Sequence, residues 1–207
     1  TFKMVKSLLN GIGDTKKVEK FYDDWSKNYE QSLIDWNYKA PRQSVNILNK
    51  YIKIKPKYLL DLACGTGLFL EEYSKLYPQC ICDGSDISKK IIDISKKKKI
   101  YRKLFKTSFE KKIKSNTQYD VVSLIGAMTY CEDHQLLLKL VFSYLKKNGY
   151  FIFTQRTDLW EKLNFDKLLR KNSHFKIIHI SRPLNYLPKN KDFKSNVKIR
   201  IVLLNKI

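Results

Sequence analysis

The feature that most constrains the fold is a regular alternation between two kinds of segment that begins after Pro56. Short apolar runs, typical of buried strands, alternate with longer segments whose apolar residues recur every three or four positions, as on one face of a helix. Parallel strands need such crossover helices, so the alternation predicts a mostly parallel sheet covered by helices on both faces. The expected strands span 58–63, 80–86, 100–106, 119–127, 150–156, 175–181 and 197–205.

The two ends of the chain depart from this alternation. No helix-like segment separates the last two expected strands, which predicts an antiparallel hairpin at one edge of the sheet. Near the start, Asp14 is placed to cap a helix, and a second helix is expected from Pro41. A chain of 207 residues suits a single domain. We predict a doubly wound α/β fold with seven strands, in which residues 1–55 form a helical cap or lid on a core of residues 56–207.

The chain carries a formal net charge of +21, from 41 Lys and Arg against 20 Asp and Glu. Such an excess raises nucleic acid or another anionic surface as a partner. Only six of the basic residues are arginine, however, and arginine supplies the forked hydrogen bonds of specific phosphate and base recognition. We therefore favour a lysine-rich solvated surface over a nucleic-acid interface.

Other compositional features indicate the compartment. No apolar run approaches the roughly 20 residues of a membrane span, and the start shows no secretory signal. The four cysteines, at 64, 80, 82 and 131, contain no CxxC pair and no disulfide framework. We expect a cytoplasmic protein with no membrane segment and no metal site.

The first expected strand runs into the glycine loop "ACGTGL", residues 63–68. In a doubly wound sheet, ligands bind at such loops, beyond the carboxyl ends of the strands. A nucleoside triphosphate is disfavoured because no lysine follows Gly67. A dinucleotide is disfavoured because Leu70 stands where glycine or alanine is needed, and because Asp61 would lie near a pyrophosphate. A carboxylate at this position suits a cationic, phosphate-free ligand such as S-adenosylmethionine.

That ligand also needs an acidic residue after the second strand to accept hydrogen bonds from its ribose. Asp86 lies 25 residues after Asp61, near the expected offset of roughly 20 residues from the glycine motif. Asp83 is the rival, but Asp86 stands at the end of the expected strand. Ile87 follows it and could pack on adenine.

Taken in order, "LLDLACGTG", "GSDIS", "YDVVSLIGAM" and "LKKNGYFIFTQR" resemble the successive motifs of class I S-adenosylmethionine-dependent methyltransferases, over roughly residues 58–156. More narrowly, "FYDDWSKNYEQSL", "YKAPR", "IGAM" and "FTQRTD" are similar to the Williams–Beuren-region methyltransferase-like family of small stand-alone enzymes. The resemblance implies a Rossmann-like fold, S-adenosylmethionine as methyl donor and S-adenosylhomocysteine as product. It also implies that an N-terminal aromatic segment folds over the donor.

The resemblance assigns roles to particular residues. The acid that many relatives carry after the third strand is missing from "FKTSFE", so Ser108 and Phe109 are the substitutes. The lid aromatics could equally be the buried stripe of a helix packed on the sheet. The residues implied to contact the donor are Tyr22, Trp25 and Tyr29 in the lid, Asp61, Ala63, Cys64, Gly65, Thr66 and Gly67 in the first loop, Asp86, Ile87, Ser108 and Phe109 on the adenosine side, and Gly126 and Ala127 after the fourth strand.

The methyl acceptor is less well marked. The chain has "IGAMTY" where enzymes that methylate base amines usually carry an Asp/Asn-Pro-Pro-aromatic element, so we expect a small-molecule acceptor, which the basic surface could steer if it is anionic. The alternatives are a nucleic-acid or protein acceptor, and a protein that binds S-adenosylmethionine without transferring a methyl group. The candidates for a catalytic group are Tyr38, Arg42, Tyr130, His134 and Arg156.

Overall fold

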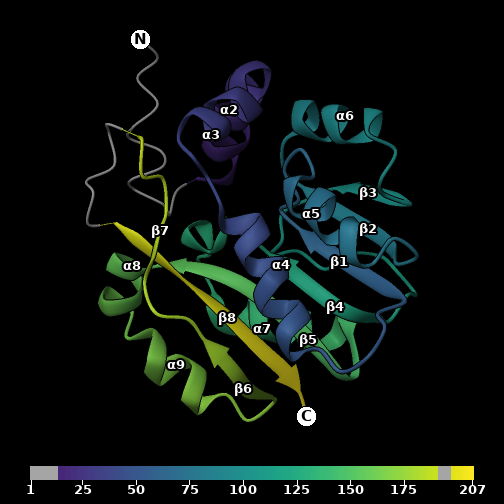
Figure 1. Ribbon diagram of the computed structural model, residues 1–207, viewed down its shortest axis with the longest axis vertical. Coiled ribbons are helices and arrows are strands. Elements are labelled where there is room, and N and C mark those ends of the chain that lie inside the picture. Colours follow the sequence, from purple (N-terminus) through teal and green to yellow (C-terminus); the bar gives the residue numbers. More distant parts are fainter. Residues whose placement is uncertain (1–13, 191–196) are drawn as a thin grey trace.

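A computed structural model describes residues 14–190 and 197–207 of the chain. Helices and strands alternate through the middle of the chain, as the sequence pattern predicts, and among the described residues three α-helices and one 3-10 turn precede the first strand (Figure 1). Among the described residues no helix is both long and apolar enough to cross a bilayer. The helices are α2 (Thr15–Trp25), the 3-10 turn η1 (Ser26–Asn28), α3 (Tyr29–Asp35), α4 (Ala40–Tyr51), α5 (Leu68–Leu76), α6 (Lys89–Lys97), the 3-10 turn η2 (Met128–Tyr130), α7 (His134–Tyr144), α8 (Thr157–Lys162) and α9 (Phe165–Lys171).

The strands form one mixed sheet in the order β3-β2-β1-β4-β5-β8-β6, with the short β7 paired to β8. All neighbours from β3 to β5 are parallel, and β8 is antiparallel to both β5 and β6. The doubly wound fold and the antiparallel C-terminal pair are therefore confirmed. β8 lies inside the sheet, however, and β6 forms its edge. The strands are β1 (Tyr58–Leu62), β2 (Ile81–Asp86), β3 (Lys103–Lys106), β4 (Tyr119–Leu124), β5 (Leu145–Arg156), β6 (Phe175–Ile180), β7 (Leu184–Asn185) and β8 (Lys198–Lys206).

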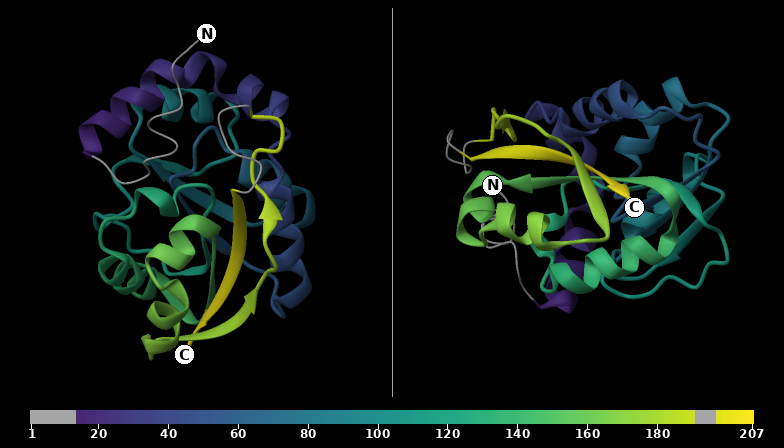
Figure 2. Two further views of the ribbon diagram at one scale, coloured as in Figure 1. Left: turned by 90° about the vertical axis from the view of Figure 1, so that its left-hand side faces the viewer. Right: turned by 90° about the horizontal axis from the view of Figure 1, so that it is seen from below.

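Apolar side chains of the central strands alternate between two cores, one on each face of the sheet. Val121 packs with α4 and α5, whereas its neighbour Val122 packs with α7 and α9. Figure 2 shows the same two layers of helices on either side of the sheet. Because both faces are buried, the strands read as continuous apolar runs, which is why the sequence reveals them clearly.

The apolar spacing in residues 159–171 predicts one helix, but the structure has two there, α8 and α9. The break falls at Asn164, whose φ of 47° lies in the left-handed region that a helix does not accept. The turn brings Trp160 and Phe165 together, with ring centroids 5.2 Å apart, and both side chains are buried. A continuous helix would place residues five positions apart on different parts of its surface, so core packing explains the break.

The helices α2 and α3 lie across the end of the sheet and are fastened to it by polar contacts (Figure 1). The Asp23 carboxylate accepts hydrogen bonds from the Ser88 hydroxyl and from the backbone N–H of Lys90, at the start of α6. Glu19 forms an ion pair with Lys106 at the end of β3. These contacts place the aromatic face of α2 over the carboxyl ends of the strands.

A second polar network is buried within the sheet. Asp83, in the middle of β2, is fully buried, and its carboxylate accepts hydrogen bonds from Arg102 and from the Tyr119 hydroxyl. Its charge is compensated there by Arg102. Asp83 is thereby a structural residue, and Asp86 alone of the two acids stands at the carboxyl end of the strand.

Replacing Arg102 by alanine leaves the buried Asp83 carboxylate without its cation, and we predict a loss of about 3 kcal/mol in the free energy of unfolding. Urea denaturation measures it. The control is Lys20→Ala, which removes an exposed ion pair with Asp24 and should change stability by less than about 1 kcal/mol. Equal effects of the two substitutions would show that the Asp83 network does not stabilise the sheet.

Candidate active site

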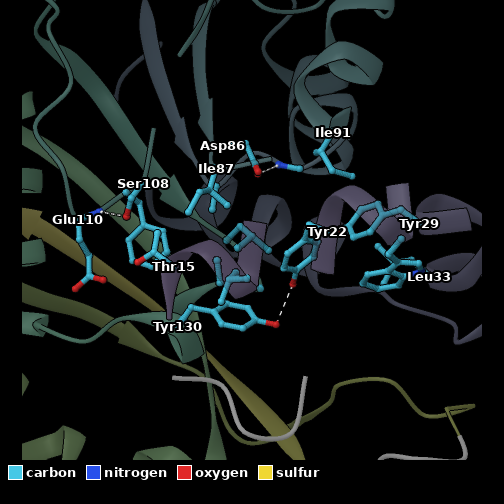
Figure 3. Close-up of a pocket in the computed structure, with 18 of the residues that line it drawn as sticks. Thr15, Tyr22, Tyr29, Leu33, Asp86, Ile87, Ile91, Ser108, Glu110 and Tyr130 are labelled. Carbon is cyan, nitrogen blue, oxygen red and sulfur yellow. Dashed lines mark hydrogen bonds between the residues drawn. The ribbon is translucent and has the colours of Figure 1, made fainter. Parts of the chain in front are cut away.

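A cavity lies between the helical lid and the carboxyl ends of the parallel strands (Figure 3). It contains about 970 Å³ of empty space, counting the part open to solvent. Its wall comes from the lid, from loops after β1 to β4 and from the segment that follows β7. The residues that line it are Thr15, Val18, Tyr22, Trp25, Tyr29, Leu33, Tyr38, Ala63, Gly65, Asp86, Ile87, Ile91, Thr107, Ser108, Phe109, Glu110, Ile125, Gly126, Ala127, Tyr130, Tyr186 and Leu187.

The glycine loop after β1 is held in a bent conformation beside this cavity. Ala63, Gly65 and Gly67 have φ values of 48°, 55° and 95°, all in the left-handed region. Gly65 is fixed on both sides: its N–H donates to the Asp86 carboxylate, and its carbonyl accepts from the Ser95 hydroxyl at 2.7 Å. Such strained backbone persists where the surroundings enforce it, and it is common at ligand sites.

Asp86 connects this loop to the end of β2. Its two carboxylate oxygens accept hydrogen bonds from the backbone N–H groups of Gly65 and Ser88, each at 2.9 Å. Burial raises the pKa of Asp86 above its ordinary value, against the opposing effect of these two hydrogen bonds. The carboxylate lines the cavity and can accept further hydrogen bonds from a ligand hydroxyl.

Asp61 occupies a smaller hollow that continues from the cavity. This hollow and the cavity share wall residues, among them Tyr29, Tyr38 and Gly65. The carboxylate of Asp61 accepts hydrogen bonds from the Ser123 and Tyr101 hydroxyls, both at 2.7 Å. Burial raises its pKa to about 7, although these two hydrogen bonds oppose the change.

The structure brings most of the predicted site residues together. Asp61, Cys64 and Thr66 line the smaller hollow. Gly67 lines neither space: it is the N-cap of α5, and a side chain at this position would meet Ile100 and Tyr101. The predicted residues that line the main cavity are Tyr22, Trp25, Tyr29, Tyr38, Ala63, Gly65, Asp86, Ile87, Ser108, Phe109, Gly126, Ala127 and Tyr130. That they contact a methyl donor stays a prediction.

The lid aromatics were expected either to cover the ligand site or to form the buried face of a helix, and the structure shows features of both. Trp25 is buried and packs in a cluster with Leu33 and Ala40, as a core residue does. Tyr22 and Tyr29 are partly exposed, and all three aromatic residues line the cavity. The same face of α2 therefore completes a core and closes a pocket.

Three candidates for a catalytic group do not line the cavity. His134, the first residue of α7, packs edge-on against the Phe165 ring, and burial lowers its pKa. Arg156 is buried and forms a two-pronged ion pair with Asp158. Arg42 is exposed on α4. Of the group only Tyr38 and Tyr130 face the cavity.

Sequence reasoning missed several residues of the site. Tyr186 and Leu187 join the wall from the far end of the chain, and Thr107, Glu110 and Ile125 extend it beside residues that were predicted. Behind the wall, the hydroxyls of Tyr101 and Ser123 donate hydrogen bonds to Asp61, and the hydroxyl of Ser95 donates to the Gly65 carbonyl. Ser123 is a polar residue inside the apolar strand "YDVVSL", and this pattern could have indicated that it has a buried hydrogen-bond partner. Nothing in the sequence marks Tyr186.

Comparisons with known proteins agree with this geometry. A family described as a methyltransferase domain matches residues 27–189. Methyltransferase-like protein 27 of Homo sapiens is 38% identical over 65 residues, 30% of this chain and 26% of that protein. Malonyl-(acyl-carrier protein) O-methyltransferase of Halalkalibacterium halodurans is 28% identical over 144 residues, 66% of this chain and 53% of that protein. The chain thus spans about a quarter and about half the length of these curated relatives.

A solved structure shows the likeness in three dimensions. The magnesium protoporphyrin IX methyltransferase of Synechocystis PCC 6803, with bound S-adenosylmethionine, superposes with a TM-score of 0.68 at 14% identity, covering 95% of this chain and 98% of that one. The sheet and the helices on its two faces have the Rossmann-like fold of the class I S-adenosylmethionine-dependent methyltransferases. The chain belongs to the methyltransferase domain family, whose match covers most of its length. The class resemblance inferred from the motifs is confirmed.

The raised pKa of Asp61 predicts a pH-dependent contribution to stability. The folded protein favours the neutral carboxyl, so this contribution is fully present below about pH 4 and is lost as the pH rises through about 7. Asp61→Asn should remove that dependence, so the difference in unfolding free energy between the two proteins should change by on the order of 3 kcal/mol between pH 4.5 and 8. Urea denaturation at several pH values measures it, and a constant difference would contradict the assignment.

Proposed function

We propose that the protein is an S-adenosylmethionine-dependent methyltransferase that acts on a small-molecule acceptor. One observation carries the proposal: the glycine loop, the Asp86 carboxylate and the tyrosines of the lid meet around a single cavity. S-adenosylmethionine would supply an activated methyl group on a sulfonium, with S-adenosylhomocysteine as the other product. The residues present fit this donor. It has no phosphate that would need a basic group, and Asp86 and Asp61 would serve its ribose and its ammonium group.

The two ends of the site would hold different parts of the donor. Asp86 would accept hydrogen bonds from the ribose hydroxyls, while Ile87 and Phe109 would pack against adenine and Ser108 would lie at its edge. The smaller hollow would hold the methionine part, with Asp61 as the nearest carboxylate. A cationic amino group there would favour the ionised form of Asp61 and release its proton.

Methyl transfer from a sulfonium needs alignment and the exclusion of water more than it needs a strong base. The lid would exclude water, since α2 closes the cavity with Tyr22, Trp25 and Tyr29. An acceptor that reacts beneath this lid has to fit inside the cavity, which supports a small molecule over a nucleic acid or a protein. The described residues of the wall include no lysine or arginine, so nothing in them supports the expectation of an anionic acceptor.

Two further parts of the proposal concern the surroundings of the enzyme. The four cysteines are free thiols, which supports a reducing compartment such as the cytoplasm. In the described part of the chain no group of three or more His, Cys, Asp or Glu side chains is placed to hold a metal ion, and the mechanism proposed here uses none.

The ribose assignment predicts that Asp86→Ala weakens binding of S-adenosylhomocysteine at least tenfold, about 1.4 kcal/mol, because two ribose hydroxyls lose a charged acceptor. Isothermal titration calorimetry measures the affinity. Asp93→Asn on the exposed side of α6 is the matched control and should bind like the natural protein. Unchanged binding by a folded Asp86→Ala protein would remove Asp86 from the ribose site.

The activity itself is tested with the purified protein, S-adenosylmethionine and a fractionated cell extract. We expect S-adenosylhomocysteine and a methylated product to form with the small-molecule fraction. Product formation only with the nucleic-acid or protein fraction would contradict the proposed acceptor class. Donor binding without product from any fraction would indicate a binding protein instead of an enzyme.

A further inference from the structure

Five tyrosines from distant parts of the chain line the same cavity, and we refer to them as the tyrosine cage. Three come from the N-terminal helices and their connection, one from the turn after β4 and one from the segment after β7. They are Tyr22, Tyr29, Tyr38, Tyr130 and Tyr186. The hydroxyl of Tyr22 donates to that of Tyr130 at 3.0 Å, and Figure 3 shows these two side chains pointing toward each other.

The rings of the cage stand at steep angles to one another, as the walls of a box do. The Tyr22 and Tyr130 rings are inclined by 80°, with centroids 6.0 Å apart. Tyr38 and Tyr186 are inclined by 82° at 5.8 Å. A tyrosine ring whose face lines a cavity offers the negative side of its quadrupole, which attracts an ammonium ion.

The phenol groups of the cage stay neutral. Burial raises the pKa of Tyr22, Tyr29 and Tyr38, and the neighbouring tyrosines raise it further. Burial and Tyr130 likewise raise the pKa of Tyr186, against an opposing effect of Arg156.

The charged groups around the cavity favour a positively charged ligand. Among the described residues of its wall the charged side chains are two acids, Asp86 and Glu110, in a protein whose net charge is +21. Glu110 already accepts hydrogen bonds from the backbone N–H groups of Glu132 and Asp133. Arg156, whose charge lowers the pKa of Tyr186, is ion-paired with Asp158 and does not line the wall.

We propose that the acceptor is a small amine whose nitrogen lies in the tyrosine cage, an inference that rests on the methyltransferase function proposed above. The lone pair of the neutral amine forms the new N–C bond while the C–S bond breaks and its electron pair stays on sulfur. One positive charge thus passes from sulfur to nitrogen, and the product is a methylated ammonium. An amine that arrives as an ammonium ion first loses one proton to solvent, and the rings then stabilise the methylated ammonium that the transfer forms.

The test uses three probes with the same ring and a different end group: 2-phenylethylamine, 2-phenylethanol and 3-phenylpropionate. Each is titrated into the complex of the protein with S-adenosylhomocysteine, and each is then incubated with the protein and S-adenosylmethionine. We expect the amine to bind about tenfold more tightly than the other two and to be methylated on nitrogen, as shown by product mass. Equal or tighter binding of the alcohol or carboxylate, or no binding of the amine, would overturn the inference.

Substitutions in the cage separate the role of the rings from that of the hydroxyls. Tyr130→Leu should weaken amine binding about tenfold, whereas Tyr130→Phe keeps the ring and should change it by less than about threefold. Tyr77→Leu, at the C-terminal end of α5 beside Asn49, is the control for loss of a partly exposed tyrosine. If Tyr130→Leu weakens only S-adenosylmethionine binding and leaves amine binding unchanged, the cage serves the donor's sulfonium and the inference is wrong.

The outcomes also distinguish this inference from the function on which it rests. Methylation of the carboxylate or the alcohol would leave the methyltransferase standing and would reject the amine acceptor. Failure of the natural protein to bind either S-adenosylmethionine or S-adenosylhomocysteine would reject both.

Discussion

The site depends on the hydrogen bonds that join the glycine loop to the neighbouring strand and helix. Gly65 donates to Asp86 at the end of β2, and its carbonyl accepts from Ser95 of α6. These contacts hold the loop in a left-handed conformation that ordinary residues adopt only at a cost of about 1–2 kcal/mol each. Without them the loop would relax, and the donor site proposed here would lose both its backbone surface and the orientation of its ribose acceptor.

The N-terminal helices that cover the cavity are also held in place by polar contacts to the core. Their aromatic face covers the cavity, and their polar face is fastened to the core by Asp23, Glu19 and Glu30. Contacts of this kind are individually weak and weakened further by salt. The buried Trp25, packed with Leu33 and Ala40, adds an apolar contact to these polar ones.

The elements of the fold could be predicted almost completely from the sequence because strands buried on both faces leave a strong local signal. The exceptions have tertiary causes. Packing of Trp160 against Phe165 divides a predicted helix in two, and the order of the two C-terminal strands, with β8 next to β5 and β6 at the edge, was left open by the sequence. Neither outcome is visible in local periodicity, since each depends on which surfaces meet after the chain has folded.

The sequence by itself determined the doubly wound sheet, the bent loop and the acid at the end of β2, since each follows from the order and spacing of nearby residues. It also favoured Asp86 over Asp83 from the place of Asp86 at the strand end, and the structure shows what Asp83 does instead, by pairing it with Arg102 inside the sheet. The tertiary structure alone excluded His134 from the cavity and brought Tyr186 into it beside Tyr130. Side chains 56 positions apart become neighbours only through the path of the whole chain, so the chemistry at the acceptor end could not be read from local pattern.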